Sequence, residues 1–295
     1  MKNNLRLAVA LGGGSARAAA HVGVLKVLEE NNLKPAVLAG TSSGAFVAAL
    51  YALGYSANEL EEIFLNFKTK EFWSQSFDFA PDQLSLIRGK RMTDYLNKEY
   101  FKDARLEDLE IPLVIATTDL ESSELVLLKK GLLAKAVMAS SSLPGIFAAI
   151  QWQGRWLIDG GFLATVPFEA LEADDLDLII GVHAGIETEK SSLIKLLKKT
   201  SKNTSHFFKT VSETMPKGSL RRWARAYQIV FASYSQELAL PQNGILITTK
   251  AKISWWDFHK MPQAIAAGEQ AMSNALPKIE RILKPVADNK QGKSI

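Results

Sequence analysis

The first 55 residues alternate between short apolar runs and helical patterns, and no other feature limits the fold as much. Residues 5–11 and 36–39 predict two strands, because each is short, apolar and followed by glycine. Residues 16–30 and 43–53 have the apolar spacing of helices, and Gly54 suits the C-cap of the second. This β-α-β-α order is typical of a parallel sheet covered by helices. We therefore predict an α/β protein with a mainly parallel central sheet.

The remainder of the chain continues this pattern. Apolar runs predict two central strands and two short or edge strands, at 111–117, 176–182, 124–128 and 155–158. Further helices are predicted at 132–140 and 261–284, and Ser56 with Glu59 predicts a capping box that opens another. Because no internal repeat or long linker interrupts the chain, we expect one domain over residues 1–295.

Composition excludes several classes of protein. Hydrophobic residues make up 47% and charged residues 22% of the chain, which excludes collagen, coiled coils and disorder. The absence of cysteine excludes disulfide scaffolds, thiolate zinc sites and a cysteine nucleophile. No apolar stretch reaches ~18 residues, and residues 7–11 are too short for the core of a signal peptide. We expect a cytoplasmic protein.

Residues 190–225 are strongly basic, with ten Lys and Arg against one acid, Glu213. Apolar side chains are interleaved with these charges, as in stretches that contact anionic membranes at the surface. The alternative is an ordinary amphipathic helix pair with a solvated basic face. Nucleic acid is not an expected partner, because no binding motif accompanies the charge.

The segment Gly40-Thr-Ser-Ser-Gly44 fits the G-x-S-x-G nucleophile elbow. It follows a predicted strand and precedes a predicted helix, which is the context that the motif requires. Ser42 is the candidate nucleophile, because centring the motif on Ser43 would put Thr41 and Ala45 at the glycine positions. The alternative is a glycine-flanked turn with two capping serines.

A second glycine cluster, Gly12-Gly13-Gly14, lies between the first strand and the first helix. Backbone amides exposed there can bind an anion, either a nucleotide phosphate or a developing oxyanion. The dinucleotide fingerprint fails, because its last glycine position falls on Arg17 and a serine motif replaces the ribose-binding acid. An oxyanion hole fits better.

Asp159 is the candidate base, since it ends a predicted strand before Gly160-Gly161 and can accept a proton if burial raises its pKa. Asp119, at another strand end, reads as a loop-capping residue. Among the four histidines, His21 reads as a packed residue, and His183 stays open as a base because it ends a strand.

The glycine cluster, the early Gly-Thr-Ser-x-Gly and the late Asp-Gly-Gly together resemble the patatin-like phospholipases, in particular bacterial members. GGGSARAAAHVGVL (12–25) is similar to the opening of that family, and ASSSLPGIF (139–147) to the segment upstream of its catalytic Asp. Pro167 also falls at the family spacing. The resemblance covers residues 5–185 well and the remainder weakly.

This resemblance implies a three-layer α/β/α fold and hydrolysis of acyl esters of phospholipids, lysophospholipids or neutral lipids. It implies a Ser42–Asp159 dyad that needs neither a histidine base nor a metal or cofactor. The residues it places around the oxyanion are Gly12, Gly13, Gly14, Ser15 and Arg17. The single patatin-like domain would comprise a catalytic core (5–185), a basic helical stretch (190–235) and a C-terminal strand and helix (244–284).

The chain departs from the family pattern at a few positions. Ser15 and Ala18 replace glycines of the loop, so a positive φ at either would strain the backbone. Ala164 and Thr165 stand where many relatives carry Asn. A catalytically weak or inactive scaffold that binds lipid or protein is therefore the alternative to an esterase.

Overall fold

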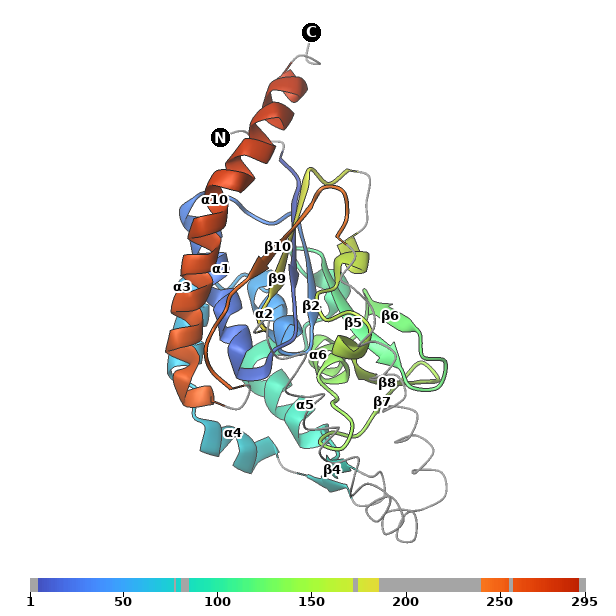
Figure 1. Ribbon diagram of the computed structural model, residues 1–295. Helices are drawn as coiled ribbons and strands as arrows, with labels where there is room; N and C mark the ends of the chain where they lie inside the picture. The colour runs from blue at the N-terminus through green and yellow to red at the C-terminus, as the bar shows by residue number, and fades with distance from the viewer. Residues whose placement is uncertain are drawn as a thin grey trace, which may run out of the picture.

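The computed structural model describes residues 5–76, 78–80, 85–171, 175–185, 240–254 and 257–291. Its central sheet has eight strands in the order β10-β9-β1-β2-β5-β8-β7, with β6 paired to β5 (Figure 1). Helices flank this sheet, so the predicted α/β class is confirmed. The basic stretch at 190–235 lies outside the described residues.

One half of the sheet is entirely parallel. β1 (Leu7–Leu11) pairs with both β2 (Val37–Thr41) and β9 (Leu178–His183). β10 (Gly244–Thr248) continues the sheet beyond β9, and β5 (Leu113–Asp119) continues it beyond β2. Because parallel strands end at one edge, the loops after β1 and β2 meet there.

The other half is antiparallel and built from shorter strands. β8 (Arg155–Asp159) pairs with β5 on one side and with β7 (Ile150–Trp152) on the other. β6 (Leu125–Leu128) also runs antiparallel to β5. The sheet is thus mixed but mostly parallel, with every pairing from β10 to β5 parallel, and the mainly parallel sheet predicted from sequence is confirmed.

The register of β5 determines how the parallel and antiparallel halves of the sheet are aligned. On one side Ala116 lies opposite Thr41, the last residue of β2. On the other side Thr117 lies opposite Asp159, the last residue of β8. The ends of β2 and β8, which run in opposite directions, are therefore offset by one residue along β5.

Side chains alternate across β1. Leu7, Val9 and Leu11 face a large core, whereas Ala8 and Ala10 face a smaller one. The large core is covered by α1 (Ala20–Glu30), α2 (Ser43–Ala52), α3 (Ala57–Leu65), α6 (Leu133–Ser140) and α10 (Met261–Gln291). The smaller core packs against the short 3₁₀ helix at Phe168–Leu171.

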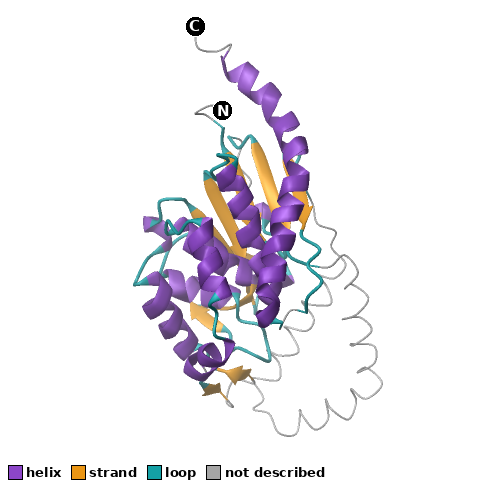
Figure 2. Ribbon diagram, turned by 90° about the vertical axis from the view of Figure 1, so that its left-hand side faces the viewer, coloured by secondary structure: helices purple, strands orange, loops and turns teal. Residues whose placement is uncertain are grey.

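The long helix α10 lies against α1 along the side of the molecule (Figures 1 and 2). Glycine permits this close crossing, because a Cβ on Gly23 would lie 2.1 Å from the Ile265 carbonyl oxygen. Lys26 adds ion pairs to Glu61 of α3 at 2.7 Å and to Glu269 of α10 at 3.0 Å.

The lower part of the molecule in Figure 1 contains α4 (Thr69–Ser76), the hairpin of β3 (Phe79–Ala80) and β4 (Ser85–Ile87), and α5 (Lys90–Leu96). A π-helical turn at Asn97–Phe101 follows α5. Within the described residues, no helix is long and apolar enough to cross a membrane.

The elements differ from the sequence prediction mainly at their ends. Residues Ser15–Ala19 form a 3₁₀ turn before α1, the second strand lies at Val37–Thr41, and the last helix extends to Gln291. The predicted capping box is confirmed, with the Ser56 side chain accepting a hydrogen bond from the Glu59 amide. Gly54 has φ +98° just after α2, as expected of a helix C-terminus.

Candidate active site

Ser42 stands at a sharp turn between β2 and α2. Its φ of 54° and ψ of −127° lie outside the regions common for residues other than glycine, as a nucleophile elbow requires. The flanking glycines allow this turn to pass close to its neighbours. A Cβ on Gly44 would lie 2.3 Å from the Leu11 carbonyl oxygen, and one on Gly40 would lie 2.5 Å from Ala45 Cα. The sharp strand-to-helix turn predicted from sequence is thus present at Ser42.

The Ser42 hydroxyl donates a hydrogen bond of 2.7 Å to Asp159 Oδ2. The other carboxylate oxygen, Oδ1, accepts a bond of 2.7 Å from the Gly161 amide, which fixes the carboxyl group in one orientation. Gly160 is required beside it, since a Cβ there would lie 2.2 Å from the Ala116 carbonyl oxygen. The structure thus brings together two predicted residues that are 117 positions apart.

Asp159 is 7% exposed, and this burial raises its pKa to about 6. The Gly161 amide and the Ser42 hydroxyl act in the opposite direction, because each stabilises the ionised form. The carboxylate is therefore largely ionised at neutral pH, yet it holds a proton more readily than an exposed aspartate. Such a pKa suits a general base that works near pH 7.

A second serine, Ser140, holds the backbone of this turn through hydrogen bonds. The Ser42 amide donates to Ser140 Oγ at 2.7 Å, and the Ser140 hydroxyl donates to the Ala116 carbonyl at 2.6 Å. Ser140 is fully buried at the end of α6. Ser140 belongs to the family-like segment 139–147, but its contact with the Ser42 amide could not be foreseen, because the two residues are 98 positions apart.

The first two amides of the glycine loop are already engaged by neighbouring backbone. Gly12 donates to the Val182 carbonyl at 3.0 Å, and Gly13 donates to the Thr165 carbonyl at 3.1 Å. A Cβ on Gly13 would lie 3.3 Å from Ser42 Cβ, so the loop passes directly beside the candidate nucleophile.

The next two amides converge on one oxygen atom. Gly14 donates to Ser43 Oγ at 3.1 Å, and Ser15 donates to the same oxygen at 2.8 Å. Both distances are close to those expected between oxyanion-hole donors and an oxyanion. From the sequence alone, Ser43 is only an alternative centre of the motif or a capping residue.

The two substituted glycine positions differ in backbone conformation. Ser15 has φ +53°, a left-handed conformation that costs an L-residue roughly 1–2 kcal/mol. Ala18 lies inside the 3₁₀ turn and has no positive φ. The expected strain is therefore present at Ser15 and absent at Ala18.

Two histidines lie near the loop. His21 is fully buried, its Nε2–H donates to the Gly12 carbonyl at 2.7 Å, and burial lowers its pKa to about 4. This confirms His21 as a neutral packed residue. His183 ends β9, and burial together with the charge of Arg17 lowers its pKa. The Ser42 hydroxyl carries one proton and donates it to Asp159 rather than to a histidine.

Arg17 lies in the 3₁₀ turn directly after the glycine loop and is 9% exposed. Its charge acts on His183, so this end of the sheet carries a buried positive charge beside the loop.

Asp119 caps the loop after β5, as the sequence predicted. One of its oxygens accepts from the Glu121 amide at 2.9 Å, and the other pairs with Arg155 at 3.3 Å. These two contacts join Asp119 to the loop after β5 and to β8.

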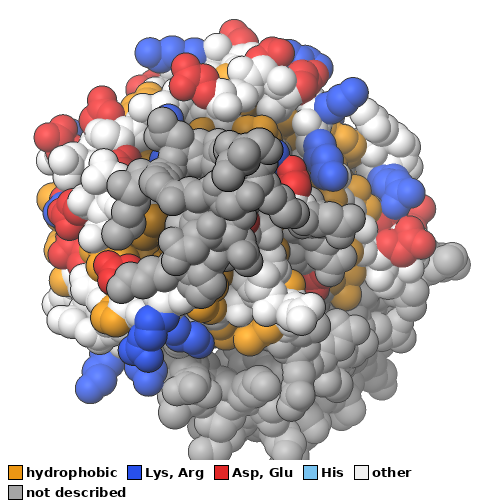
Figure 3. Space-filling view, turned by 90° about the horizontal axis from the view of Figure 1, so that it is seen from above, with side chains coloured by type: hydrophobic (Ala, Val, Ile, Leu, Met, Phe, Trp, Pro, Cys, Tyr) orange, Lys and Arg blue, Asp and Glu red, His pale blue; other side chains and the backbone are white. Residues whose placement is uncertain are grey.

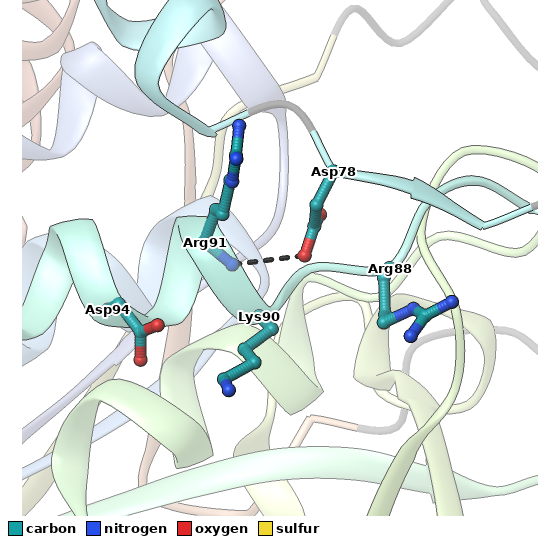
Figure 4. A pocket seen from close by; sticks show the side chains of 5 residues that line it. All are labelled: Asp78, Arg88, Lys90, Arg91 and Asp94. Carbon is teal, nitrogen blue, oxygen red and sulfur yellow. Dashed lines mark hydrogen bonds between the residues drawn. The ribbon is translucent and has the colours of Figure 1, made fainter.

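A cavity of about 460 Å³ lies apart from these residues and is lined by Asp78, Arg88, Lys90, Arg91 and Asp94 (Figure 4). Asp78 caps the start of α5 there, accepting from the Gly89 amide at 2.8 Å and the Arg91 amide at 3.1 Å.

Seen from above, acidic and basic side chains are interspersed with hydrophobic ones on the described surface (Figure 3). No group of three or more potential metal ligands occurs among the described residues.

This chain is similar in sequence to several curated proteins. It is 31% identical over 193 residues to human patatin-like phospholipase domain-containing protein 6, covering 62% of this chain and 14% of that protein. It is 28% identical to lysophospholipase NTE1 of Candida albicans, over 65% of this chain and 14% of that protein. An uncharacterized NTE family protein of Mycobacterium tuberculosis is 31% identical over 60% of this chain and 48% of its own length. The chain thus spans at most about half of these relatives.

Among solved structures, VipD from Legionella pneumophila is similar with a TM-score of 0.49 and 16% identity, over 94% of this chain and 67% of VipD. Residues 9–172 match the profile of the family described as patatin-like phospholipase. That range contains the glycine loop, Ser42 and Asp159, and it covers more than half of the chain. This chain therefore belongs to the patatin-like phospholipase family.

Proposed function

We propose that this protein is a serine hydrolase of lipid acyl esters in which Ser42 is the nucleophile and Asp159 its base. The observation that carries the proposal is the 2.7 Å hydrogen bond from the Ser42 hydroxyl to the buried Asp159 carboxylate. Family membership and the names of the phospholipase and lysophospholipase relatives support the substrate class.

In the acylation step, Asp159 Oδ2 takes the proton of Ser42 as Oγ attacks the ester carbonyl carbon. Asp159 then gives this proton to the departing alkoxide oxygen, and the acyl group remains on Ser42 as an ester. The raised pKa of Asp159, caused by burial, favours both transfers, because the group must accept and return a proton near neutral pH.

The negative charge on the carbonyl oxygen needs donors beside Ser42. Of the predicted loop residues, Gly12 and Gly13 donate their amides to other carbonyls, so their role is to hold the loop in place. We assign the oxyanion to the amides of Gly14 and Ser15, which point at one common position. Arg17 adds its positive charge beside the loop.

Deacylation uses the same groups. Asp159 removes a proton from a water molecule, the resulting hydroxide attacks the acyl carbon, and Ser42 Oγ leaves and regains a proton from Asp159. The products are a fatty acid and free enzyme. Phospholipase A, lysophospholipase and simple carboxylesterase activities all follow from this scheme.

We further propose that the whole chain forms one domain, because β10 pairs with β9 and α10 packs on α1.

We also propose that residues 190–225 bring the protein to anionic membranes through their basic charge. Sedimentation with anionic vesicles tests this. Binding that weakens between low and high salt supports it, whereas no binding or salt-insensitive binding contradicts it.

The hydrolase proposal is tested with a series of p-nitrophenyl acyl esters and with phospholipid and lysophospholipid, comparing wild type with Ser42→Ala. We expect turnover by the wild type and only background hydrolysis by the variant. Equal silence of both proteins on every substrate would favour the alternative, an inactive member that binds lipid or protein.

A further inference from the structure

The two amides that we assign to the oxyanion are already occupied by a side chain of this protein. Ser43 Oγ accepts from Gly14 and Ser15, and no other bond links this serine to the loop in the residues described. These contacts join positions 28 and 29 residues apart, so they are not a cap of the helix that Ser43 begins. A hydroxyl oxygen has two lone pairs, and both are used here.

A substrate carbonyl cannot bind at this position while Ser43 Oγ is there. The amides converge on a single point, and two oxygen atoms cannot share it. For the oxyanion to receive both hydrogen bonds, the Ser43 hydroxyl must first move away. Ser43 is partly exposed, so rotation about its Cα–Cβ bond can carry the hydroxyl towards solvent without moving the backbone of the elbow.

We propose that the Ser43 hydroxyl is a placeholder that fills the oxyanion hole in the free enzyme and gives way to the ester carbonyl when substrate binds. This inference rests on the proposed hydrolase function. The placeholder keeps the Gly14 and Ser15 amides bonded, and it helps to hold Ser15 in its left-handed conformation when no substrate is present.

The placeholder also competes with substrate. In each productive binding event, the carbonyl oxygen must replace the Ser43 hydroxyl. The free energy by which the hydroxyl favours the filled oxyanion hole therefore weakens both substrate binding and transition-state stabilisation. Removing the hydroxyl leaves only exchangeable water in the hole. Since one net neutral hydrogen bond changes an equilibrium about fivefold, we expect Ser43→Ala to raise kcat/KM by about fivefold.

The test compares wild type, Ser43→Ala and Ser43→Thr, with Ser42→Ala as the inactive reference. Threonine keeps the hydroxyl and is the matched control, so it should not exceed the wild-type rate. Two readouts are measured, namely kcat/KM for a p-nitrophenyl ester and the labelling rate with a fluorophosphonate, whose phosphoryl oxygen needs the same two donors. Thermal melting verifies that each variant is folded.

Faster hydrolysis and faster labelling by Ser43→Ala alone would support the placeholder, as would turnover by Ser43→Ala when the wild type is silent. An active wild type with Ser43→Ala equal or slower would overturn the placeholder and leave the hydrolase intact. Equal gains in the alanine and threonine variants would also overturn it. Silence and lack of labelling in all folded variants would overturn the hydrolase function and the placeholder with it.

Discussion

Asp159 and Asp119 are two buried aspartates that end neighbouring antiparallel strands, and their surroundings give them different chemistry. They are 7% and 5% exposed. Asp119 receives a loop amide and the guanidinium of Arg155. Asp159 receives one amide and the hydroxyl of Ser42. Asp119 therefore has a positively charged partner, whereas Asp159 has two uncharged donors.

This contrast teaches that burial alone does not produce a base. A buried carboxylate beside a cation is stabilised as an anion and holds structure, whereas a buried carboxylate with only neutral partners has a raised pKa and can exchange a proton. The sequence around each residue reflects the difference. Asp159 precedes two glycines that leave room beside it, whereas Asp119 begins a turn closed by its own side chain.

The largest expected effect separates the two acids in catalysis. Asp159→Asn keeps the shape of the side chain but removes the proton acceptor, so kcat for ester hydrolysis should fall by about 10²–10⁴. Asp119→Asn is the matched control and should stay within about threefold of wild type. Steady-state kinetics on one p-nitrophenyl ester measure both. Wild-type turnover by Asp159→Asn would remove it as the base.

The pH profile gives the next largest effect. Protonated Asp159 cannot accept the Ser42 proton, and burial places its pKa at about 6. We therefore expect log(kcat/KM) to be flat above pH 7 and to fall by one unit for each pH unit below about 6. Asp119→Asn should have the same profile. A profile that stays flat down to pH 4 would contradict the assignment.

Stability should change in opposite directions in the two variants. Because the pKa of Asp159 is raised by burial above its unfolded value, the native state binds more protons between about pH 4 and 6, and the free energy of unfolding falls as pH rises through that window. At pH 7 to 8, Asp159→Asn removes this penalty and should stabilise the fold by about 1–3 kcal/mol. Asp119→Asn loses a charge-assisted contact and should destabilise by about 1–3 kcal/mol.

Urea unfolding of both variants at pH 7.5, followed by circular dichroism, measures this difference. Two variants that shift the midpoint in the same direction would show that the surroundings of the two acids do not determine their energetics as we describe.

The smallest expected effect concerns His183. In a Ser-His-Asp hydrolase, replacing the histidine would abolish turnover, whereas here the Ser42 proton goes to Asp159. We expect His183→Ala to retain kcat within about threefold of wild type, because His183 lies beside the loop without bonding the nucleophile. A loss of 10² or more in a folded variant would return the histidine to the mechanism.

Local patterns were sufficient to predict the strands and helices of the parallel half. β1, β2, α1 and α2 follow directly from apolar periodicity and glycine, because each of these elements is closed by residues next to it in sequence. The elbow could be predicted for the same reason. The β3–β4 hairpin and α5 were not predicted, since these elements are only two, three and seven residues long and their residues carry no clear period.

The contacts that complete the site depend on register rather than on motif. Asp159 was found as a strand end followed by glycines, but its meeting with Ser42 is set by β5, which pairs Ala116 with Thr41 and Thr117 with Asp159. The roles of Ser140 and Ser43 could not be predicted at all. Each depends on a partner that is distant in sequence and that only the folded sheet brings near.

The most direct test of the central claim is to label the protein with a fluorophosphonate and identify the modified residue by peptide mass spectrometry. The account predicts a single adduct on Ser42, absent in Ser42→Ala and strongly reduced in Asp159→Asn. An adduct on Ser43 or on another serine, or labelling of Ser42→Ala at the wild-type rate, would contradict it.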